Sequence, residues 1–513
     1  MSRLSRNILY NLAGQALLFV LSFVAVRFVF RQLGAEAFGI ILFTQTVNFL
    51  LVAVLELGIS STTVREISAH LHDDPAYVAD VFRTGSLLYW TGYAVLAAVL
   101  IVLAPLLVEK WINLQALDAT TATRMVQILG VATLLALPRS LYASLFRGLQ
   151  RMAFTNVIDV GTSALQQLGI ILILAYHGSL FAVIDWIAVS YLLGIAAYVL
   201  MASRFVPWRT LLPGFSATVV RRNRRFALHM MSISALATVH TQADKVVVSK
   251  LMPVGVLGYY SFASAVVTRA TMVSSAVAQA AFPSFSDLFH RSQRPALMSQ
   301  YGKLQTLISF SMVPLYAAIT FAALPFFGYL FTPAIGQRLL APTALLCAGF
   351  YLNSTLAVPY VFSLAVGKPE ISVRQNVYAV FTVLPATVVL VALFGLVGAA
   401  ASWVLYNLFA YAYGVPRICR ECLLISPASW YAQIARAVAL GAATYGTAWL
   451  LLAYFERLTL PYLVAGYVVG SAAFVLGAYG FIGPELRHTL IGLAPFRRRR
   501  VQSLTLPPRS PRK

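Results

Sequence analysis

Charged residues are scarce in this chain of 513 residues. Asp, Glu, Lys and Arg make up only 11% of it, whereas hydrophobic residues make up 60%. A soluble domain usually carries about 25% charged residues. A soluble chain of this length would form roughly three domains, and too little charge is present to cover their surfaces. The mean hydropathy of +0.79 agrees. The composition excludes a soluble enzyme, a disordered chain and a coiled coil, and it favours a polytopic helical membrane protein.

Cysteine and acidic residues are also few. The three cysteines, Cys347, Cys419 and Cys422, predict no disulfide framework. The Cys-x-x-Cys at 419–422 lacks a second ligand pair nearby, so we expect no metal and no other cofactor. No G-x-x-x-x-G-K-[ST] run is present, so direct drive by ATP is not expected. Lys and Arg exceed Asp and Glu by 22. In a membrane protein this excess is expected to face anionic lipid headgroups, and we expect no nucleic-acid partner.

Apolar stretches of about 20 residues, long enough to cross a bilayer as a helix, recur along the whole chain. No stretch shows sustained strand alternation, so we expect an all-α polytopic membrane protein with about fourteen transmembrane helices. These helices are predicted at residues 8–31, 37–62, 83–107, 123–147, 155–176, 180–202, 226–250, 257–282, 304–330, 339–366, 372–394, 396–416, 432–454 and 460–482.

Basic residues gather in every second connection between these helices. The connection at 204–225 holds six arginines, and the run at 497–500 holds four. Loops rich in Lys and Arg stay on the cytoplasmic side of a membrane. This pattern predicts a multi-pass protein of the plasma membrane with its N- and C-termini in the cytoplasm.

The chain contains two similar halves. Gly39 and Gly258 are 219 residues apart, and Gly148 and Gly367 have the same offset. This favours a duplication of six helices into parallel repeats, an arrangement used by transporters. The expected domains are a first six-helix lobe (1–203), a cytoplasmic linker (204–225), a second six-helix lobe (226–421), helices 13 and 14 (422–485) and a basic cytoplasmic tail (486–513).

Polar and charged residues inside the predicted spans are the candidate functional residues, because each is costly unless it faces a cavity or a partner. A cavity that takes up anionic groups needs cations, and carboxylates or a histidine can carry a coupling ion. The substrate-binding candidates are Arg27, Arg31, Lys245 and Arg269. The coupling candidates are His240, Asp244, Asp159 and Glu56. The candidates at the cytoplasmic entrance are Arg65, Arg147 and Arg151.

Each candidate also has a plain structural interpretation. Arg31 lies near a membrane boundary and can extend its charge into the headgroups. The three entrance arginines fit positive-inside anchoring equally well. Helical spacing of four lets His240 and Asp244 touch, whereas the neighbours Asp244 and Lys245 are expected to diverge. A coupling pair and a structural hydrogen bond both remain open for His240 and Asp244.

Several runs resemble the polysaccharide-transporter family of Wzx-type flippases, in the multidrug/oligosaccharidyl-lipid/polysaccharide (MOP) superfamily. FRQLGAEAFGIILFTQTV is similar to the signature after the first helix of that family, and TQADKVVVSKLMPVGVLGYYSFA to the stretch at the seventh. The similarity spans about residues 8–420 in order, and its further runs are ELGISSTTVREIS, RGLQRMAFTN, AFPSFSDL and AVGKPEISVRQN.

The resemblance implies a V-shaped pair of six-helix bundles around a central cavity that rocks between inward-open and outward-open states. It implies an oligosaccharide on undecaprenyl pyrophosphate as substrate, moved between leaflets of the bacterial inner membrane. Membrane lipids, a polysaccharide polymerase and export proteins are the implied partners. Arg31 takes the place of the signature arginine, and Asp244 with Lys245 that of the helix-seven pair. Arg27 and Arg269 are proposed on charge and depth alone. Proton or sodium coupling stays open, as do the glycan and its pathway.

Three alternatives remain. A multidrug/cation antiporter of the superfamily would have twelve helices and a cavity dominated by carboxylates. A peptidoglycan-precursor flippase would have fourteen helices, but Phe23, Val24 and Ala25 stand where its early arginine–aspartate pairing is expected. An integral-membrane glycan polymerase would expose catalytic residues on a long periplasmic loop. The largest such loop, 108–122, offers only Glu109, Lys110 and Asp118, so we expect no enzyme.

Overall fold

The computed structural model describes residues 3–55, 58–71 and 73–481. These residues form helices and contain no strand apart from one isolated bridge between Asn113 and Pro253. Two predicted features, the coupling candidate Glu56 and the tail 486–513, lie outside the described residues.

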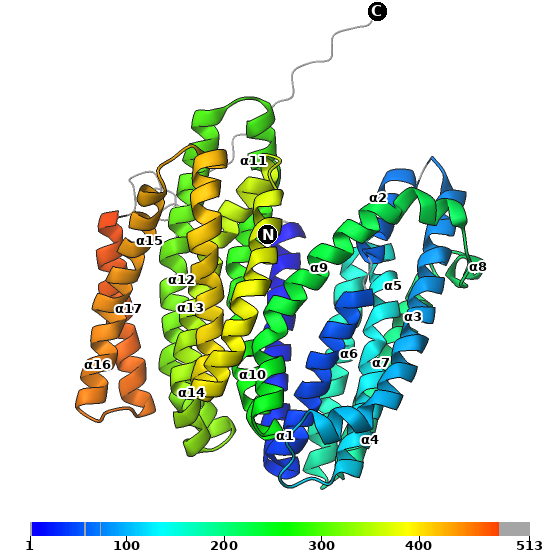
Figure 1. The fold of residues 1–513 in the computed structure, drawn as a ribbon, viewed down its shortest axis with the longest axis horizontal. Helices are drawn as coiled ribbons and strands as arrows, with labels where there is room; N and C mark the ends of the chain where they lie inside the picture. The colour runs from blue at the N-terminus through cyan, green and yellow to red at the C-terminus, as the bar shows by residue number, and fades with distance from the viewer. Residues whose placement is uncertain (1–2, 56–57, 72, 482–513) are drawn as a thin grey trace, which may run out of the picture.

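The first group of helices forms one arm of a V (Figure 1). α1 turns sharply at Gly34, whose φ of 87° suits glycine, so it contains two passes rather than one. The second pass and the helices after it make the arm. The bounds are α1 (Arg3–Leu55), α2 (Ile59–His70), α3 (Pro75–Lys110), α4 (Ala119–Leu134), α5 (Ala136–Gly148), α6 (Met152–Ala175) and α7 (Leu180–Ala202).

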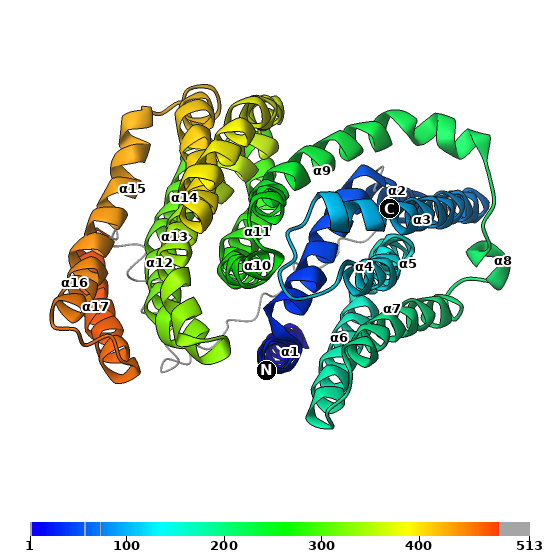
Figure 2. The ribbon, with the colours of Figure 1, turned by 60° about the horizontal axis from the view of Figure 1, so that its bottom comes forward.

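The second group forms the other arm, and the long helix α9 crosses diagonally from the first arm to it (Figures 1 and 2). α14 repeats the pattern of α1, because it turns at Gly395 with a φ of 58°. The bounds are α8 (Trp208–Leu211), α9 (Ala217–Leu251), α10 (Val254–Arg269), α11 (Thr271–His290), α12 (Arg294–Leu330), α13 (Pro333–Ala365), α14 (Glu370–Ile418), η1 (Cys419–Leu423), α15 (Pro427–Gly441), η2 (Ala442–Gly446), α16 (Thr447–Tyr454) and α17 (Leu460–Phe481).

Ten helical stretches among the described residues are long and apolar enough to cross a membrane. α9 and the α10–α11 pair are not among them. The total of fourteen transmembrane helices therefore stays a prediction. α9 begins at Ala217, nine residues before the predicted start at 226, because its arginine-rich first turns continue the helix beyond the apolar run.

The arms meet at one end of the molecule, which we call the closed end (Figure 1). There the second pass of α1 crosses α10, and the two glycines of the repeat face each other: a Cβ on Gly258 would lie 2.9 Å from the Cα of Gly39. The backbone N–H of Val254 donates to the carbonyl of Asn113 at 3.1 Å. Phe30 packs on Phe331 with 4.5 Å between ring centroids. Glycine is required at this crossing because it lets the two backbones approach closely.

Candidate functional site: a cavity between the arms

A cavity of about 540 Å³ is lined by the second pass of α1 and by α9, α10, α11, α13 and α14. Gln45 of α1 lines it six residues beyond Gly39, which is about 9 Å of helix rise. The other arm supplies most of the wall. The lining residues are Leu42, Gln45, Thr46, Phe49, His240, Thr241, Gln242, Asp244, Lys245, Ser261, Phe262, Ser264, Ala265, Thr268, Thr271, Leu346, Phe350, Asn353, Asn376, Trp403 and Tyr406.

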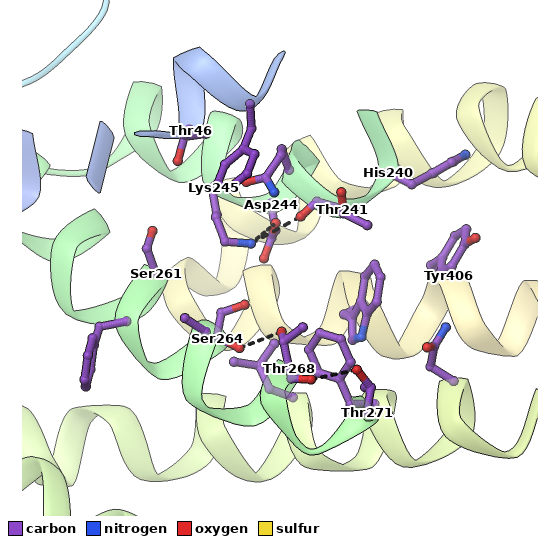
Figure 3. Close-up of a pocket in the computed structure, with 18 of the residues that line it drawn as sticks. Thr46, His240, Thr241, Asp244, Lys245, Ser261, Ser264, Thr268, Thr271 and Tyr406 are labelled. Carbon is purple, nitrogen blue, oxygen red and sulfur yellow. Dashed lines mark hydrogen bonds and ion pairs between the residues drawn. The ribbon is translucent and has the colours of Figure 1, made fainter. Parts of the chain in front are cut away.

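Lys245 and Asp244 form the charged centre of this cavity (Figure 3). The Lys245 Nζ lies 3.5 Å from Asp244 Oδ1 and donates to the carbonyl of Thr241 at 3.2 Å. The other Asp244 oxygen accepts a hydrogen bond of 2.8 Å from the hydroxyl of Tyr260 on α10. The Lys245 side chain is 15% exposed and that of Asp244 is 8% exposed. A buried carboxylate is thus satisfied by a cation and a hydroxyl, as low-dielectric surroundings require.

One expectation about Asp244 was wrong: Lys245 was expected to diverge from it, and the two side chains meet. The spacing would let His240 touch Asp244 as well, but His240 takes another partner. The His240 Nε2–H donates to the carbonyl of Asn376 on α14 at 2.9 Å, and the ring lies 4.8 Å from that of Tyr406. Helical spacing fixes only the direction in which a side chain leaves the backbone. The long Lys245 side chain folds back along its own helix and so reaches the neighbouring Asp244.

A row of hydroxyls faces the cavity from α10 and α11, and the sequence analysis missed it. Ser261, Ser264, Thr268 and Thr271 all line the wall (Figure 3). Their spacing of three, four and three residues places them on one helical face, a signal that could have identified them. The Ser261 Oγ is buried and has no hydrogen-bond partner among the described residues.

Aromatic rings and amides complete the wall on α13 and α14. Trp403 stacks on Tyr406 with 5.3 Å between centroids and an interplanar angle of 19°. The Trp403 Nε1 is the second buried lining atom without a hydrogen-bond partner in the described part of the chain. Tyr406 donates its hydroxyl to Asn376 Oδ1 at 3.0 Å, and Asn353 supplies another amide. The wall therefore presents apolar faces, hydroxyls and amides around one lysine–aspartate pair.

The structure does not bring the other predicted cations to this cavity's lining. Arg27 donates to the carbonyl of Tyr329 at the end of α12, and its guanidinium carbon lies 3.5 Å above that tyrosine ring. Arg269 is exposed and lies 5.5 Å from the Phe19 ring centroid. Arg31 is exposed near the Gly34 turn. Their roles in substrate binding stay predictions.

Asp159 belongs to a separate cluster within the first arm. Arg139 of α5 donates to Asp159 of α6, and the hydroxyl of Tyr198 on α7 donates to the same carboxylate oxygen at 2.7 Å. Arg139 was missed although it lies inside the predicted helix 123–147, where its charge was a signal that could have identified it. One carboxylate thus links three helices, which gives this coupling candidate a structural contact as well.

The three entrance arginines lie on α2, α5 and the connection before α6, at the open end of the V. Arg65 donates to Glu66 Oε1 at 2.5 Å and to Asn223 Oδ1 at 2.7 Å. Arg147 donates to the carbonyl of Ala143 at 3.4 Å. The guanidinium carbon of Arg151 is 4.7 Å from the Phe205 ring centroid. Among the described residues no group of three or more His, Cys, Asp or Glu side chains could hold a metal ion.

Known proteins resemble this chain in sequence and fold. Residues 4–289, more than half of the chain, match the family described as "Polysaccharide biosynthesis protein". A Shigella flexneri protein named "Putative O-antigen transporter" is 20% identical over 409 residues, which are 78% of this chain and 93% of that protein.

Two solved structures show the fold. The lipid II flippase MurJ in an inward closed conformation matches with a TM-score of 0.67 and 13% identity, over 94% of this chain and 100% of that one. An inward-facing multidrug resistance MATE family transporter of the MOP superfamily matches with a TM-score of 0.64 and 14% identity, over 79% of this chain and 95% of that one.

Proposed function

This chain belongs to the polysaccharide biosynthesis protein family and is a multi-pass membrane protein with the MOP fold, and from that premise we propose that it flips an undecaprenyl-pyrophosphate-linked oligosaccharide. The glycan headgroup moves from the cytoplasmic to the periplasmic leaflet of the bacterial inner membrane while the isoprenoid tail stays in lipid. The two arms rock about the closed end, so the cavity opens to one side at a time.

The observation that carries the proposal is the lining of the cavity. A sugar presents hydroxyls at its rim and C–H groups on its faces. Crossing about 30 Å of hydrocarbon would strip these hydroxyls of water at a cost of several kcal/mol each. The hydroxyl row on α10 and α11 and the amides of Asn353 and Asn376 supply replacement hydrogen bonds. The Trp403 ring offers an apolar face. Its Nε1–H and the Ser261 hydroxyl are buried in the wall without a partner among the described residues, so both can bond a ligand once the wall shifts to expose them.

The lysine at the centre suits the diphosphate. Lys245 is the only Lys or Arg among the described lining residues, so it is the group for which an incoming diphosphate would compete with Asp244. A multidrug/cation antiporter is disfavoured, because Asp244 is the only carboxylate among the described residues that line the cavity, and Lys245 neutralises it. With the arginine-rich connections placed in the cytoplasm, the closed end faces the periplasm and the described conformation faces inward. Whether protons or sodium drive the rocking stays a prediction.

The test is a leaflet assay with purified protein in proteoliposomes. Undecaprenyl-pyrophosphate oligosaccharide from the source bacterium is loaded, and the fraction of glycan that an external glycosidase reaches is followed over time. Protein-dependent exposure beyond the half of the pool that starts outside supports flipping. Lys245→Ala is expected to slow exposure more than tenfold, because hydrogen bonds to charged groups contribute about 1.5–3 kcal/mol.

Lys303→Ala is the matched control, because Lys303 is exposed on α12 and does not line the cavity. It is expected to flip at the wild-type rate. Glycan exposure that is no faster with folded protein than without it would contradict the proposal. Glycan that returns chemically modified would favour an enzyme instead.

A further inference from the structure

A second, nearly apolar slot lies near the open end of the V, apart from the cavity. It has a volume of about 220 Å³ and lies between the first half of α9 and the helices α2 and α3. The lining residues are Ile59, Thr62, Thr63, Val81, Thr84, Gly85, Leu88, Val219, Val220, Asn223, Arg224, Ala227 and Leu228. Leu88, Val220 and Leu228 are each more than a third exposed, so the slot opens on its surroundings rather than being sealed.

Exposed arginines lie on the same stretch of α9 as the residues that line this slot. Arg221, Arg222, Arg224 and Arg225 are all exposed, and Arg224 itself lines the slot. Arg222 donates to His70 Nε2 at 3.0 Å, which holds α9 against α2. Arg221 and Arg224 are three residues apart, so they share one face, and neither has a carboxylate partner among the described residues. A basic row beside an apolar slot complements a lipid whose phosphate lies above its chains.

A buried polar atom inside the slot gives independent support. The Thr62 Oγ1 has no hydrogen-bond partner among the described residues, although Thr62 is only 6% exposed. Buried hydroxyls in proteins nearly always find a partner. The ester carbonyl that joins an acyl chain to a phospholipid headgroup is an acceptor at the depth between phosphate and chain, so it would satisfy this hydroxyl.

We propose that the α2–α3–α9 slot binds one anionic glycerophospholipid, with an acyl chain in the slot, an ester carbonyl on Thr62 and the phosphate on Arg221 and Arg224. This site does not depend on the proposed function. Because α9 carries both the slot residue Ala227 and the cavity residue His240, about 20 Å apart along the helix, the bound lipid pins one end of the helix that forms the cavity wall.

Binding is measured on the full-length protein by native mass spectrometry in detergent, with dioleoyl phosphatidylglycerol and dioleoyl phosphatidylcholine as probes. The wild type is expected to retain phosphatidylglycerol in preference. Arg224→Ala should weaken that binding about fivefold, the effect of one basic residue near an anionic surface. Ala227→Phe should abolish it, because the ring fills the slot. Arg417→Ala removes an exposed arginine at the same end of the other arm and should change nothing.

Thr62→Val keeps the shape of the residue and removes the hydroxyl. It is expected to weaken phosphatidylglycerol binding while the melting temperature stays the same or rises, which separates a lipid contact from a role in folding. Equal retention of both lipids by the wild type, or undiminished binding in a monodisperse Ala227→Phe protein, would overturn the proposal. Preferential retention of undecaprenyl phosphate would also overturn it, because the slot would then belong to the substrate chain. None of these outcomes depends on the leaflet assay.

Discussion

The substitution Gly258→Ala tests whether the glycine crossing keeps the arms together at the closed end. The added Cβ would lie 2.9 Å from the Cα and 3.0 Å from the backbone nitrogen of Gly39. Carbon atoms in contact prefer about 3.5–4.0 Å, and backbone atoms cannot rotate away. Overpacking of this kind costs about 1–3 kcal/mol. Because the strain exists only while the crossing is closed, the ratio of closed to open protein should fall about 5- to 150-fold.

The assay is a distance measurement by double electron–electron resonance. Spin labels are placed at Ala116 and Gln337, exposed positions in the connections after α3 and at the start of α13. Gly258→Ala is expected to add a population with a longer distance. The control is Gly302→Ala, where the added Cβ meets nothing within 4 Å, and its distances should match the wild type. An unchanged distribution in a folded Gly258→Ala protein would refute the reasoning.

Three further substitutions probe the cavity and its surroundings. Ser261→Ala removes only the unpartnered hydroxyl, so flipping in the leaflet assay should slow about fivefold, the contribution of one neutral hydrogen bond, while the melting temperature does not fall. Tyr198→Phe removes the hydrogen bond to Asp159 and should lower the free energy of unfolding, measured by thermal unfolding, by about 1 kcal/mol. A variant as stable as the wild type would show that the Arg139–Asp159–Tyr198 cluster does not hold the helices together. Arg269→Ala is expected from the sequence to slow flipping in the leaflet assay. If Arg269→Ala flips at the wild-type rate while Lys245→Ala is slow, substrate binding is confined to the cavity that Lys245 lines.

Most of the fold could be predicted from the sequence, because a membrane-spanning helix requires a long apolar run that is easily recognised. Each long apolar run became helix, since a bilayer leaves the backbone no other partner. The turns at Gly34 and Gly395 fall where apolar runs were divided. Composition does not reveal how far a helix continues into water, so the early start of α9 at Ala217 was missed.

The site was predicted only in part. Asp244, Lys245 and His240 were found because charge inside an apolar run is costly and therefore conspicuous. Ser261 escaped notice because a small hydroxyl costs little and is common in membrane helices. Arg269 was proposed for the cavity on charge and depth alone, and neither says which neighbour its helix face meets. That information lies in the packing of helices far apart in the sequence.

The bridge between Asn113 and Pro253 bears on which substitutions the contact between the arms can tolerate. Its hydrogen bond joins the N–H of Val254 to a main-chain oxygen of the other arm, so no side chain takes part. Substitutions at Asn113 or Val254 leave this donor and acceptor in place, except that proline at 254 would delete the donor. The Asn113 side chain makes a separate hydrogen bond to the carbonyl of Lys250 at 3.1 Å, which a substitution there would remove. The Val254–Asn113 bond therefore depends on the path of the main chain and not on side chains. Substitutions around it, apart from the glycines of the crossing, can change how readily the arms separate without removing this bond.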